Sequence, residues 1–161
     1  MHLRPATADD ADLLTDLVAA AVNWTGEERV RARDVAADPH LARYVAGWGR
    51  PSDLGVVALD GTGEPVGAAW LRLLTADAPG WGYVADDVPE LSMAVLAQGR
   101  GTGAGSALLD ACLDAARQAG RRAVSLSVED GNAVARAMYE RRGFRPVGRV
   151  GGSDTLLLDL R

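Results

Sequence analysis

Hydrophobic residues recur along the chain with two periods, one typical of strands and one typical of helices. Alternating or continuous apolar runs predict strands over residues 2–5, 54–59, 66–74, 91–97, 123–128, 145–150 and 155–160. Apolar positions three and four residues apart predict helices over 13–22, from residue 106 onward and over 132–142, with one or two short helices within 23–52. This order predicts a mixed α/β sheet, mostly antiparallel, with one right-handed parallel crossover.

Turn and cap residues mark where several of these elements begin and end. Thr7 to Asp10 is similar to a capping box before the first helix, and segment 60–63 predicts a hairpin. Gly143 is expected to end the last helix, so that Phe144 packs back against it. A long loop rich in glycine and aspartate, residues 75–89, precedes the central strand.

The central part of the chain joins a strand, a glycine-rich turn and a helix. Apolar residues alternate with small ones from residue 91, glycines then occupy positions 99, 101, 103 and 105, and helical spacing follows. Free N–H groups at a helix N-terminus bind anions, and glycines let a phosphate approach closely. We therefore predict that Arg100 to Gly105 holds a phosphate or pyrophosphate. The alternative is a tight turn whose glycines serve geometry alone.

Two other classes of phosphate-binding loop are also rich in glycine. A P-loop requires a lysine, and the sequence contains none, which excludes that class. A dinucleotide-binding loop matches formally through Gly99, Gly101 and Ala104, with Glu129 as a ribose ligand at the end of the next strand. However, the chain lacks the repeated β–α–β series that usually surrounds such a loop.

The segment most closely resembles the coenzyme A loop of the GNAT acyltransferase superfamily, in which Gln or Arg is followed by x-x-Gly-x-Gly/Ala. The same pattern also begins at Gln98, but the offsets from Arg100 to Val95 and to Leu108 favour the Arg100 register. Downstream, further positions are similar to the family's next strand and helix: Leu126 to Val128, Asn132, Ala135, Tyr139, Gly143 and Phe144. The resemblance extends from residue 3 to 160 and is strongest over 90–144.

The resemblance implies a single N-acetyltransferase domain over residues 1–161. It implies a GNAT-like sheet of about seven strands, with helices on both faces and a splayed cofactor cleft. The cosubstrate would be acetyl-coenzyme A, and no metal is expected. The implied cofactor-binding residues are Met93, Val95, Arg100, Gly101, Thr102, Gly103, Ala104, Gly105 and Asn132. For Met93 and Val95 a core position is the alternative, and for Asn132 it is helix capping.

Acetyl transfer to an amine needs a base for the amine and an acid for the departing thiolate. The resemblance implies Tyr139 as the acid, and core packing is the alternative role. Glu90, at the entrance of the central strand, is the predicted base, and an exposed strand-end glutamate is its alternative. Asp86 and Asp87 are further carboxylates in the same approach.

The acceptor site is predicted from aromatic and acidic residues outside the matched motifs. In the family, this pocket is built from the region after the first helix and the loop before the central strand. The corresponding side chains here are Trp24, Tyr44, Trp48, Trp81 and Tyr83, with Glu27, Glu28, Asp86 and Asp87. They suit a cationic or aromatic amine, although the tryptophans also suit the core of the N-terminal half. His2 and His40 are expected to be structural or surface residues, and Cys112 an inert buried thiol.

Composition limits the partners and the compartment. A net charge of −5 argues against nucleic acid as a partner, and no apolar run is long enough for a membrane helix. The single cysteine and the absence of a signal-like N-terminus favour the cytoplasm. The predicted function is transfer of an acetyl group to a primary amine of a small molecule or peptide, in a ternary complex. A non-catalytic coenzyme A sensor and a nucleotide-dependent oxidoreductase remain alternatives, and a homodimer is left open.

Overall fold

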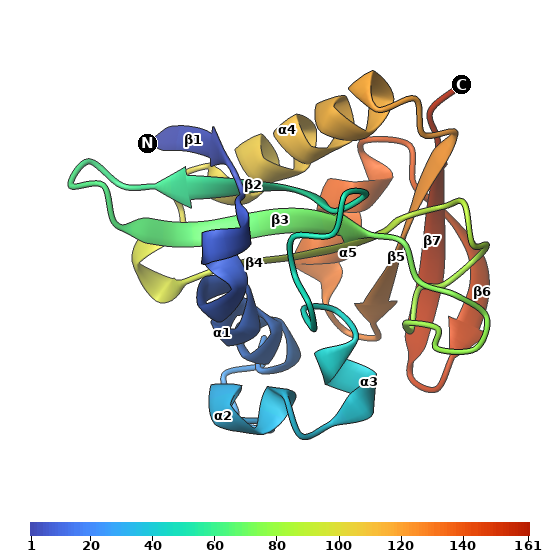
Figure 1. The fold of residues 1–161 in the computed structure, drawn as a ribbon, viewed down its shortest axis with the longest axis horizontal. Helices are drawn as coiled ribbons and strands as arrows, with labels where there is room; N and C mark the ends of the chain where they lie inside the picture. The colour runs from blue at the N-terminus through green and yellow to red at the C-terminus, as the bar shows by residue number, and fades with distance from the viewer.

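The computed structural model describes residues 1–161 and contains one seven-stranded sheet with helices on both faces (Figure 1). The strands are β1 (His2–Pro5), β2 (Leu54–Leu59), β3 (Pro65–Arg72), β4 (Glu90–Val95), β5 (Ala123–Glu129), β6 (Arg145–Val150) and β7 (Ser153–Asp159). Their order in the sheet is β1-β2-β3-β4-β5-β7-β6, and every neighbouring pair is antiparallel except β4 and β5. The predicted mixed fold with one parallel crossover is therefore confirmed.

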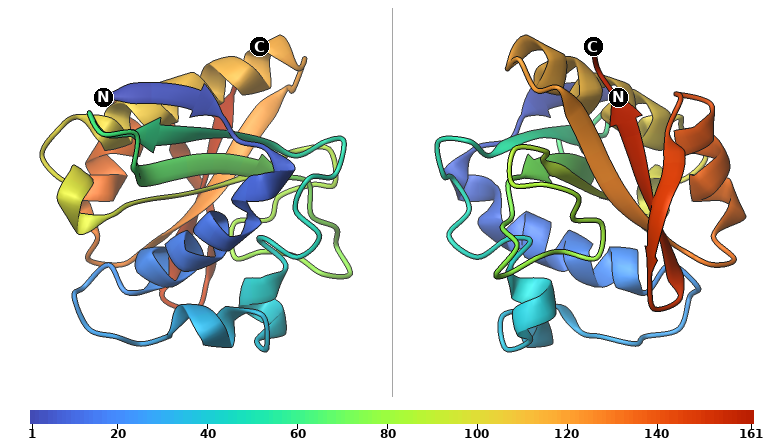
Figure 2. Two further views of the ribbon diagram at one scale, coloured as in Figure 1. Left: turned by 60° about the vertical axis from the view of Figure 1, so that its left-hand side comes forward. Right: turned by 90° about the vertical axis from the view of Figure 1, so that its right-hand side faces the viewer.

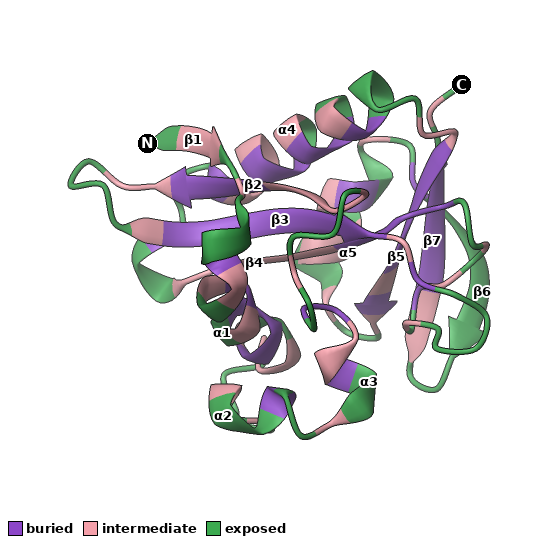
Figure 3. Cartoon of the chain, in the orientation of Figure 1, coloured by how far each residue is buried: buried purple, intermediate pink, exposed green.

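The helices divide between the two faces of the sheet, as the two views of Figure 2 show. One face carries α4 (Ala104–Gln118) and α5 (Ala133–Glu140), and the other carries α1 (Ala11–Val22), α2 (Ala32–Val35) and α3 (Pro39–Ala42). Each face has its own apolar cluster, and the alternation of side chains along the strands separates the two. In Figure 3 the middle strands are mostly buried, whereas the edge strand β6 is exposed along its length.

Local sequence signals explain most element ends. The capping box forms as predicted: Thr7 accepts from the backbone of the first turn, and Asp10 accepts from the Thr7 N–H at 2.7 Å. Gly143 has a left-handed φ of 98°, and Phe144 packs against Tyr139 with ring centroids 5.8 Å apart. None of the helices has the length and apolar composition needed to span a membrane.

Several predicted boundaries were wrong by one or two residues, at α1, α5 and β7 as well as around the central unit. The strand predicted over 66–74 ends at Arg72, and the central strand ends at Val95, where a short 3-10 turn (Ala97–Gly99) begins. The central helix begins at Ala104 rather than at residue 106. Leu74 is buried although it follows the end of β3, so its apolar character does not mark a strand residue, and Ala104 is buried in the first turn of α4.

β4 and β5 separate almost as soon as they meet. Their only direct pair is Glu90 with Ser125, whereas β3 and β4 pair along their whole length. We call this divergence the β4–β5 fork. Leu96 N–H donates to Val66 O at 2.7 Å, so every second residue of β4 bonds to β3. The backbone groups of Met93 and Val95 alternate with these and therefore point into the fork.

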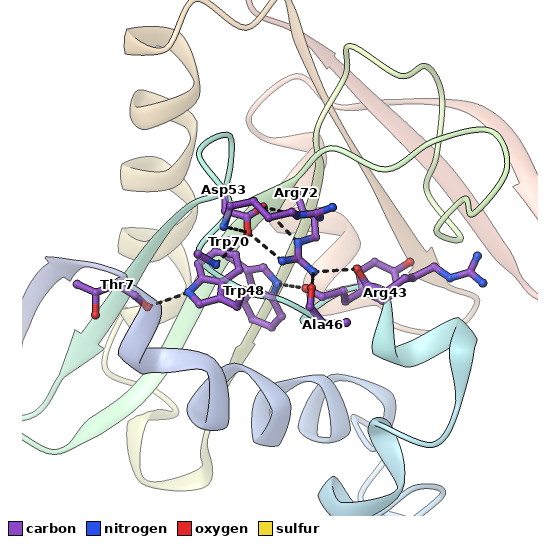
Figure 4. Close-up of polar contacts among 10 residues, drawn as sticks. Thr7, Arg43, Ala46, Trp48, Asp53, Trp70 and Arg72 are labelled. Atoms are coloured by element: carbon purple, nitrogen blue, oxygen red, sulfur yellow. Dashed lines mark hydrogen bonds and ion pairs between the residues drawn. The ribbon is translucent and has the colours of Figure 1, made fainter.

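A buried ion pair fastens the segment after α3 to the sheet (Figure 4). Arg72 on β3 bonds Asp53 at 2.9 Å, with both side chains almost fully buried. The same guanidinium donates to the carbonyl groups of Arg43 and Ala46 at 3.2 and 2.6 Å. Trp70 Nε1 donates to Tyr44 O at 3.1 Å. The main chain of residues 43–46 is thus held at three points, which fixes where the Tyr44 side chain projects.

Candidate active site

The glycine-rich turn presents free backbone donors at the start of α4. Gly101 and Gly103 have positive φ angles of 75° and 82°, a conformation that glycine adopts without strain. The Thr102 hydroxyl donates to Gly99 O at 2.6 Å and closes the turn. None of the N–H groups of residues 101–106 donates to a backbone carbonyl. Successive free N–H groups at the positive end of a helix dipole form a concave site for an anion.

The surroundings of the glycines distinguish a ligand-facing turn from a packed one. A Cβ added at Gly101 or Gly103 would meet nothing within 4 Å, so the open side of the turn has room for a phosphate group. By contrast, a Cβ at Gly99 would lie 2.9 Å from the Val66 side chain, so that glycine serves packing. The residues present therefore fit a pyrophosphate at 100–105, and the Arg100 side chain is exposed in the same turn.

Glu90 is not the exposed strand-end glutamate of the alternative interpretation. Its side chain is 3% exposed, and it faces the α1 side of the sheet, because its neighbour Leu91 belongs to the cluster under α4. The Tyr44 hydroxyl donates to Glu90 Oε2 at 2.6 Å, and Tyr44 in turn accepts from the Trp81 N–H at 2.9 Å. The other carboxyl oxygen, Oε1, has no hydrogen-bond partner.

Burial controls the ionisation of this carboxyl group. Loss of solvent raises the pKa of Glu90 from 4.5 to about 7, and the Tyr44 hydrogen bond opposes that rise. The backbone N–H of Gly82 also lowers the pKa of Glu90. It does not meet the geometry of a hydrogen bond to Oε1. A carboxyl group with a pKa near 7 exchanges protons readily at neutral pH, which is what a general base requires.

The loop segment Pro79–Tyr83 covers Glu90. A Cβ added at Gly80 would lie 2.2 Å from Glu90 Oε1, and one at Gly82 would lie 2.5 Å from the backbone of Leu126 on β5. Only glycines allow the segment to lie this close to both strands. The segment is tied down by hydrogen bonds from Arg43 to Pro79 O and from Thr155 to Trp81 O.

Tyr139 lies on the opposite face from Glu90. It belongs to the apolar cluster under α4 and α5, and burial alone raises the pKa of its hydroxyl to about 12. The hydroxyl is not among the buried oxygens that lack a partner, so it is not sealed from solvent. Arg142 joins α5 to α4 through Asp110 at 2.7 Å and thereby holds the helix of Tyr139 beside the glycine-rich turn.

Some of the other predicted site residues already have hydrogen-bond or ion-pair partners, and others have none. Asn132 makes no capping hydrogen bond, so capping does not explain its position. Asp87 forms a surface ion pair with Arg122, and Asp86 accepts from the Tyr83 hydroxyl. Glu129, the ribose ligand of the dinucleotide alternative, bonds Arg29 at 2.9 Å and Trp24 at 3.2 Å. Since β4 and β5 are also the only parallel pair, the sheet lacks the repeated crossovers of a dinucleotide-binding fold.

The aromatic residues predicted for an acceptor pocket do not all gather in one place. Trp81 stacks in parallel on Tyr44, with centroids 6.3 Å apart, and His40 lies 6.0 Å from Trp81. His40 is a surface residue, as predicted, although it lies beside the ring of Trp81. Trp48 instead donates to Thr7 O at 2.8 Å, and its ring lies under the Arg72 guanidinium. Trp48 therefore packs in the N-terminal half of the chain and does not line a pocket with Tyr44 and Trp81.

Two features escaped the sequence interpretation, and one prediction outside the motifs holds. The Arg72–Asp53 pair and the unpaired Ser125 hydroxyl carry no motif, and only the buried-strand pattern around each gave any signal. Cys112 is fully buried, and burial raises the pKa of its thiol to about 12, as expected for an inert thiol. No group of three or more potential metal-ligating side chains is present.

Comparisons with known proteins agree with this geometry. The family model described as acetyltransferase (GNAT) family matches residues 15–144. A mycothiol acetyltransferase from Beutenbergia cavernae is 44% identical over 100 residues, which cover 62% of this chain but only 31% of that relative. The chain thus matches about a third of the relative's length.

Solved structures share the fold over nearly the whole chain. A ribosomal-protein-alanine N-acetyltransferase from Brucella melitensis has a TM-score of 0.71 at 22% identity, covering 99% of this chain and 100% of that one. A GNAT superfamily phosphinothricin acetyltransferase from Sinorhizobium meliloti, solved in complex with AcCoA, has a TM-score of 0.69 at 21% identity, covering 99% and 88%. At these identities the similarity shows the fold alone.

Proposed function

The chain belongs to the GNAT acetyltransferase family, and from this premise we propose that it transfers the acetyl group of acetyl-coenzyme A to a primary amine. The transfer is direct, with both substrates bound together. The observation that carries the proposal is the β4–β5 fork, which has free anion-binding N–H groups near one end and a buried carboxyl group of raised pKa at its start.

Acetyl-coenzyme A supplies an activated thioester when bound. The N–H groups of residues 101–106 and the α4 dipole hold its pyrophosphate, with Arg100 adding charge. The backbone groups of Met93 and Val95, which face the fork, pair with the amide groups of its extended arm as a neighbouring strand would. Asn132, free of any capping bond, is available to the same ligand.

Glu90 and Tyr139 manage the two protons of the reaction. The amine nitrogen bonds to the acetyl carbon as the carbon–sulfur bond breaks. Glu90 receives the proton that the amine loses, directly or through water, and Tyr139 donates the proton that the sulfur gains. Because Glu90 and Tyr139 lie on opposite faces of the sheet, the proton acceptor and the proton donor would approach the reacting groups from opposite sides. Exchange with solvent restores both groups after each turnover.

The acceptor is a primary amine, and the aromatic side chains beside Glu90 are Tyr44 and the Trp81 ring stacked on it. Stacked aromatic rings beside a carboxyl group suit an amine that carries a flat or apolar group. The similarity to a mycothiol acetyltransferase makes the acceptor of that enzyme the first compound to test.

The test is coenzyme A release measured with acetyl-coenzyme A and a panel of primary amines, with mass spectrometry of the products. We expect thiol release that depends on the amine. We also expect an amine product about 42 mass units heavier than the substrate, because an acetyl group replaces one hydrogen. Cofactor binding without transfer to any amine would instead support the alternative of a coenzyme A sensor. A chain that binds neither acetyl-coenzyme A nor coenzyme A would contradict both.

A further inference from the structure

A short loop segment, Pro79–Gly82, covers Glu90 on the α1 side of the sheet. Gly80 lies directly against Glu90 Oε1, and Gly82 lies against the backbone of β5. The Trp81 ring between them is 37% exposed, and none of these loop residues belongs to an apolar cluster. The segment therefore seals the carboxyl group while it buries little apolar surface of its own. We call Pro79–Gly82 the Glu90 lid.

Three hydrogen bonds to other elements hold the lid in place. Arg43 donates to Pro79 O. The Tyr44 hydroxyl accepts the Trp81 N–H at 2.9 Å, and the Thr155 hydroxyl donates to Trp81 O at 3.3 Å. When the lid lifts, water can replace each of these partners, so the net cost of breaking the bonds is modest.

The loop on either side of the lid lies between fixed ends. Leu74 and Val88 are buried in separate apolar clusters, and Tyr83 packs against the cluster under α1. Residues 75–79 are exposed. Exposed segments that bury few apolar groups open locally at a low cost in free energy. The lid can therefore lift while the sheet stays folded.

The closed lid leaves a cost inside the protein. Glu90 Oε1 is buried without a hydrogen-bond partner, and so is the hydroxyl of Ser125, the residue paired with Glu90 on β5. The other carboxyl oxygen, Oε2, accepts the Tyr44 hydroxyl at 2.6 Å. An unpaired polar group in a protein interior is costly. Lifting the lid admits water to Oε1, so this cost opposes the hydrogen bonds that keep the lid closed.

No cation pairs with Glu90 under the closed lid. Arg72 is opposite Glu90 across β3 and β4, but its guanidinium bonds Asp53 and two carbonyl groups. Arg43 favours the carboxylate at longer range, yet it donates to two backbone carbonyl groups. Loss of solvent therefore dominates and raises the pKa of Glu90 to about 7. The closed lid thus suits the neutral carboxyl group better than the carboxylate.

We propose that the Glu90 lid is an autoinhibitory cover, which stays closed when Glu90 is neutral and lifts when Glu90 is ionised. Under the closed lid neither water nor substrate reaches Oε1, so the carboxyl group cannot take up a proton from the reaction. A carboxylate gains more from water than a neutral carboxyl group does, so ionisation favours the open lid. The pKa of about 7 under the lid, against the ordinary 4.5, corresponds to an open population that grows by up to about 300-fold as the pH rises between these values. The role of the lid in catalysis rests on the proposed acetyl transfer.

The first experiment observes the lid without turnover. The protein is labelled with 5-fluorotryptophan, and Trp81→Phe assigns the Trp81 signal among those of the four tryptophans. From about pH 5 to about pH 8, the ¹⁹F signal of Trp81 is expected to move as the ring leaves Tyr44, because the open population grows over this range. In Glu90→Gln, whose side chain does not ionise, the signal should stay at one position.

His40 is the alternative cause of such a movement. Its ring lies 6.0 Å from that of Trp81, and histidines as a class titrate in the same pH range. If the lid responds to Glu90, the movement persists in His40→Gln and vanishes in Glu90→Gln. The reverse result, or a wild-type signal that does not move with pH, overturns the proposal.

The second experiment holds the lid open. A Cβ at Gly80 would collide with Glu90 Oε1 and lie 2.6 Å from the Tyr44 oxygen, so Gly80→Ala prevents closure. Glu90 then regains solvent, and the acidic limb of kcat/KM for the amine is expected to move to lower pH by about 1–2 units. Gly61→Ala is the matched control, because a Cβ there meets nothing within 4 Å, and it should keep the wild-type limb. A folded Gly80→Ala variant whose limb does not move contradicts the proposal.

Thr155→Val weakens the closed lid without a clash. It removes the hydrogen bond to Trp81 O and little volume, so the open population rises and kcat/KM should increase by about 2- to 10-fold. A threonine that merely supports the fold would lower stability and leave kcat/KM unchanged. An active wild type in which Gly80→Ala and Thr155→Val both keep the wild-type kcat/KM at each pH overturns the lid alone. Inactivity toward every amine overturns the proposed function, and the Trp81 signal, measured without substrate, then supports or overturns the lid by itself.

Discussion

At the scale of single residues, the fork places two ionisable groups in different surroundings on opposite faces. Both are buried, but burial acts on them with different consequences. It raises the pKa of Glu90 to about 7, where the group can lose a proton at neutral pH, and that of Tyr139 to about 12, where it keeps its proton. The environment thus suits one group to accept a proton and the other to donate one.

Glu90→Gln is expected to remove the proposed base and to change how stability depends on pH. The folded-state pKa of Glu90 lies above its ordinary value of 4.5, so its favourable contribution is complete below pH 4.5 and is lost as the pH rises through about 7. The size of that loss is about 3 kcal/mol. Glutamine does not titrate, so the variant should gain stability relative to the wild type between pH 5 and 8, an interval of about three units around the raised pKa. Thermal melts across this interval test the sign.

The same variant tests the kinetic role. In the wild type, kcat/KM for the amine should rise through about pH 7 and then level off, because Tyr139 stays protonated well above that range. Glu90→Gln should abolish most of the activity and the rise attributed to this group. A variant that keeps the wild-type profile would show that the base is water or another side chain.

Tyr139→Phe removes one hydroxyl and almost no volume. If Tyr139 protonates the thiolate, turnover should fall by about 10²–10⁴-fold when chemistry limits the rate, with acetyl-coenzyme A affinity retained. If it serves only packing against Phe144, stability should change and turnover should not. Steady-state kinetics and melting curves on the same preparation distinguish the outcomes. Tyr83→Phe is a matched control, since Tyr83 lies in the loop and bonds Asp86.

At the scale of elements, the site depends on β4, whose residues point their backbone groups alternately to β3 and into the fork. Ser92 and Ala94 direct their backbone groups to β3, whereas Met93 and Val95 direct theirs into the fork. The register of β3 and β4 therefore decides which residues a ligand meets. It is fixed by the buried alternation of both strands, since a slip by one residue would exchange the two faces.

Hydrogen exchange should make this alternation visible. Without ligand, the amides of Met93 and Val95 should exchange faster than those of Ser92 and Ala94, because only the latter bond to β3. Acetyl-coenzyme A should slow the Met93 and Val95 amides selectively. Residue-resolved NMR exchange measures both effects. Equal protection of all four amides in the unliganded protein would contradict the assignment of the fork-facing edge.

Features encoded by neighbouring residues could be predicted from the sequence, whereas features that depend on contacts between distant segments could not. The strand–glycine turn–helix unit was predictable, because alternation, glycine spacing and helical period follow one another within residues 90–120. The environment of Glu90 was not, because Tyr44 and the Gly80–Gly82 segment reach it from distant parts of the chain. The Ser125 hydroxyl was equally hidden, since a serine within an apolar strand has the same pattern whether or not it is paired.

At the scale of the whole molecule, the two faces have separate cores that meet through one sheet. The cluster under α4 and α5 supports the glycine-rich turn and Tyr139, and the cluster under α1 supports Tyr44 and thereby Glu90. A ligand that enters the fork touches elements that both cores hold in place. Binding to the folded chain alone therefore stabilises the protein as a unit.

Because ligand binding and folding are linked, melting shifts test acetyl-coenzyme A and the 100–105 turn together. At about 100 times its dissociation constant, acetyl-coenzyme A should stabilise the fold by about 2.7 kcal/mol, which corresponds to a melting shift of about 5–10 °C for a chain of this size. NAD should give no shift, because Glu129 is bonded to Arg29 and Trp24 and is not free to bind a ribose. Gly103→Val should remove most of the acetyl-coenzyme A shift, since a β-branched residue resists the φ of 82° and its side chain projects where the phosphate approaches. Ligand-free melts of the variant measure its own stability separately. A shift with NAD alone, or an undiminished acetyl-coenzyme A shift in folded Gly103→Val, would remove the 100–105 turn from the binding site.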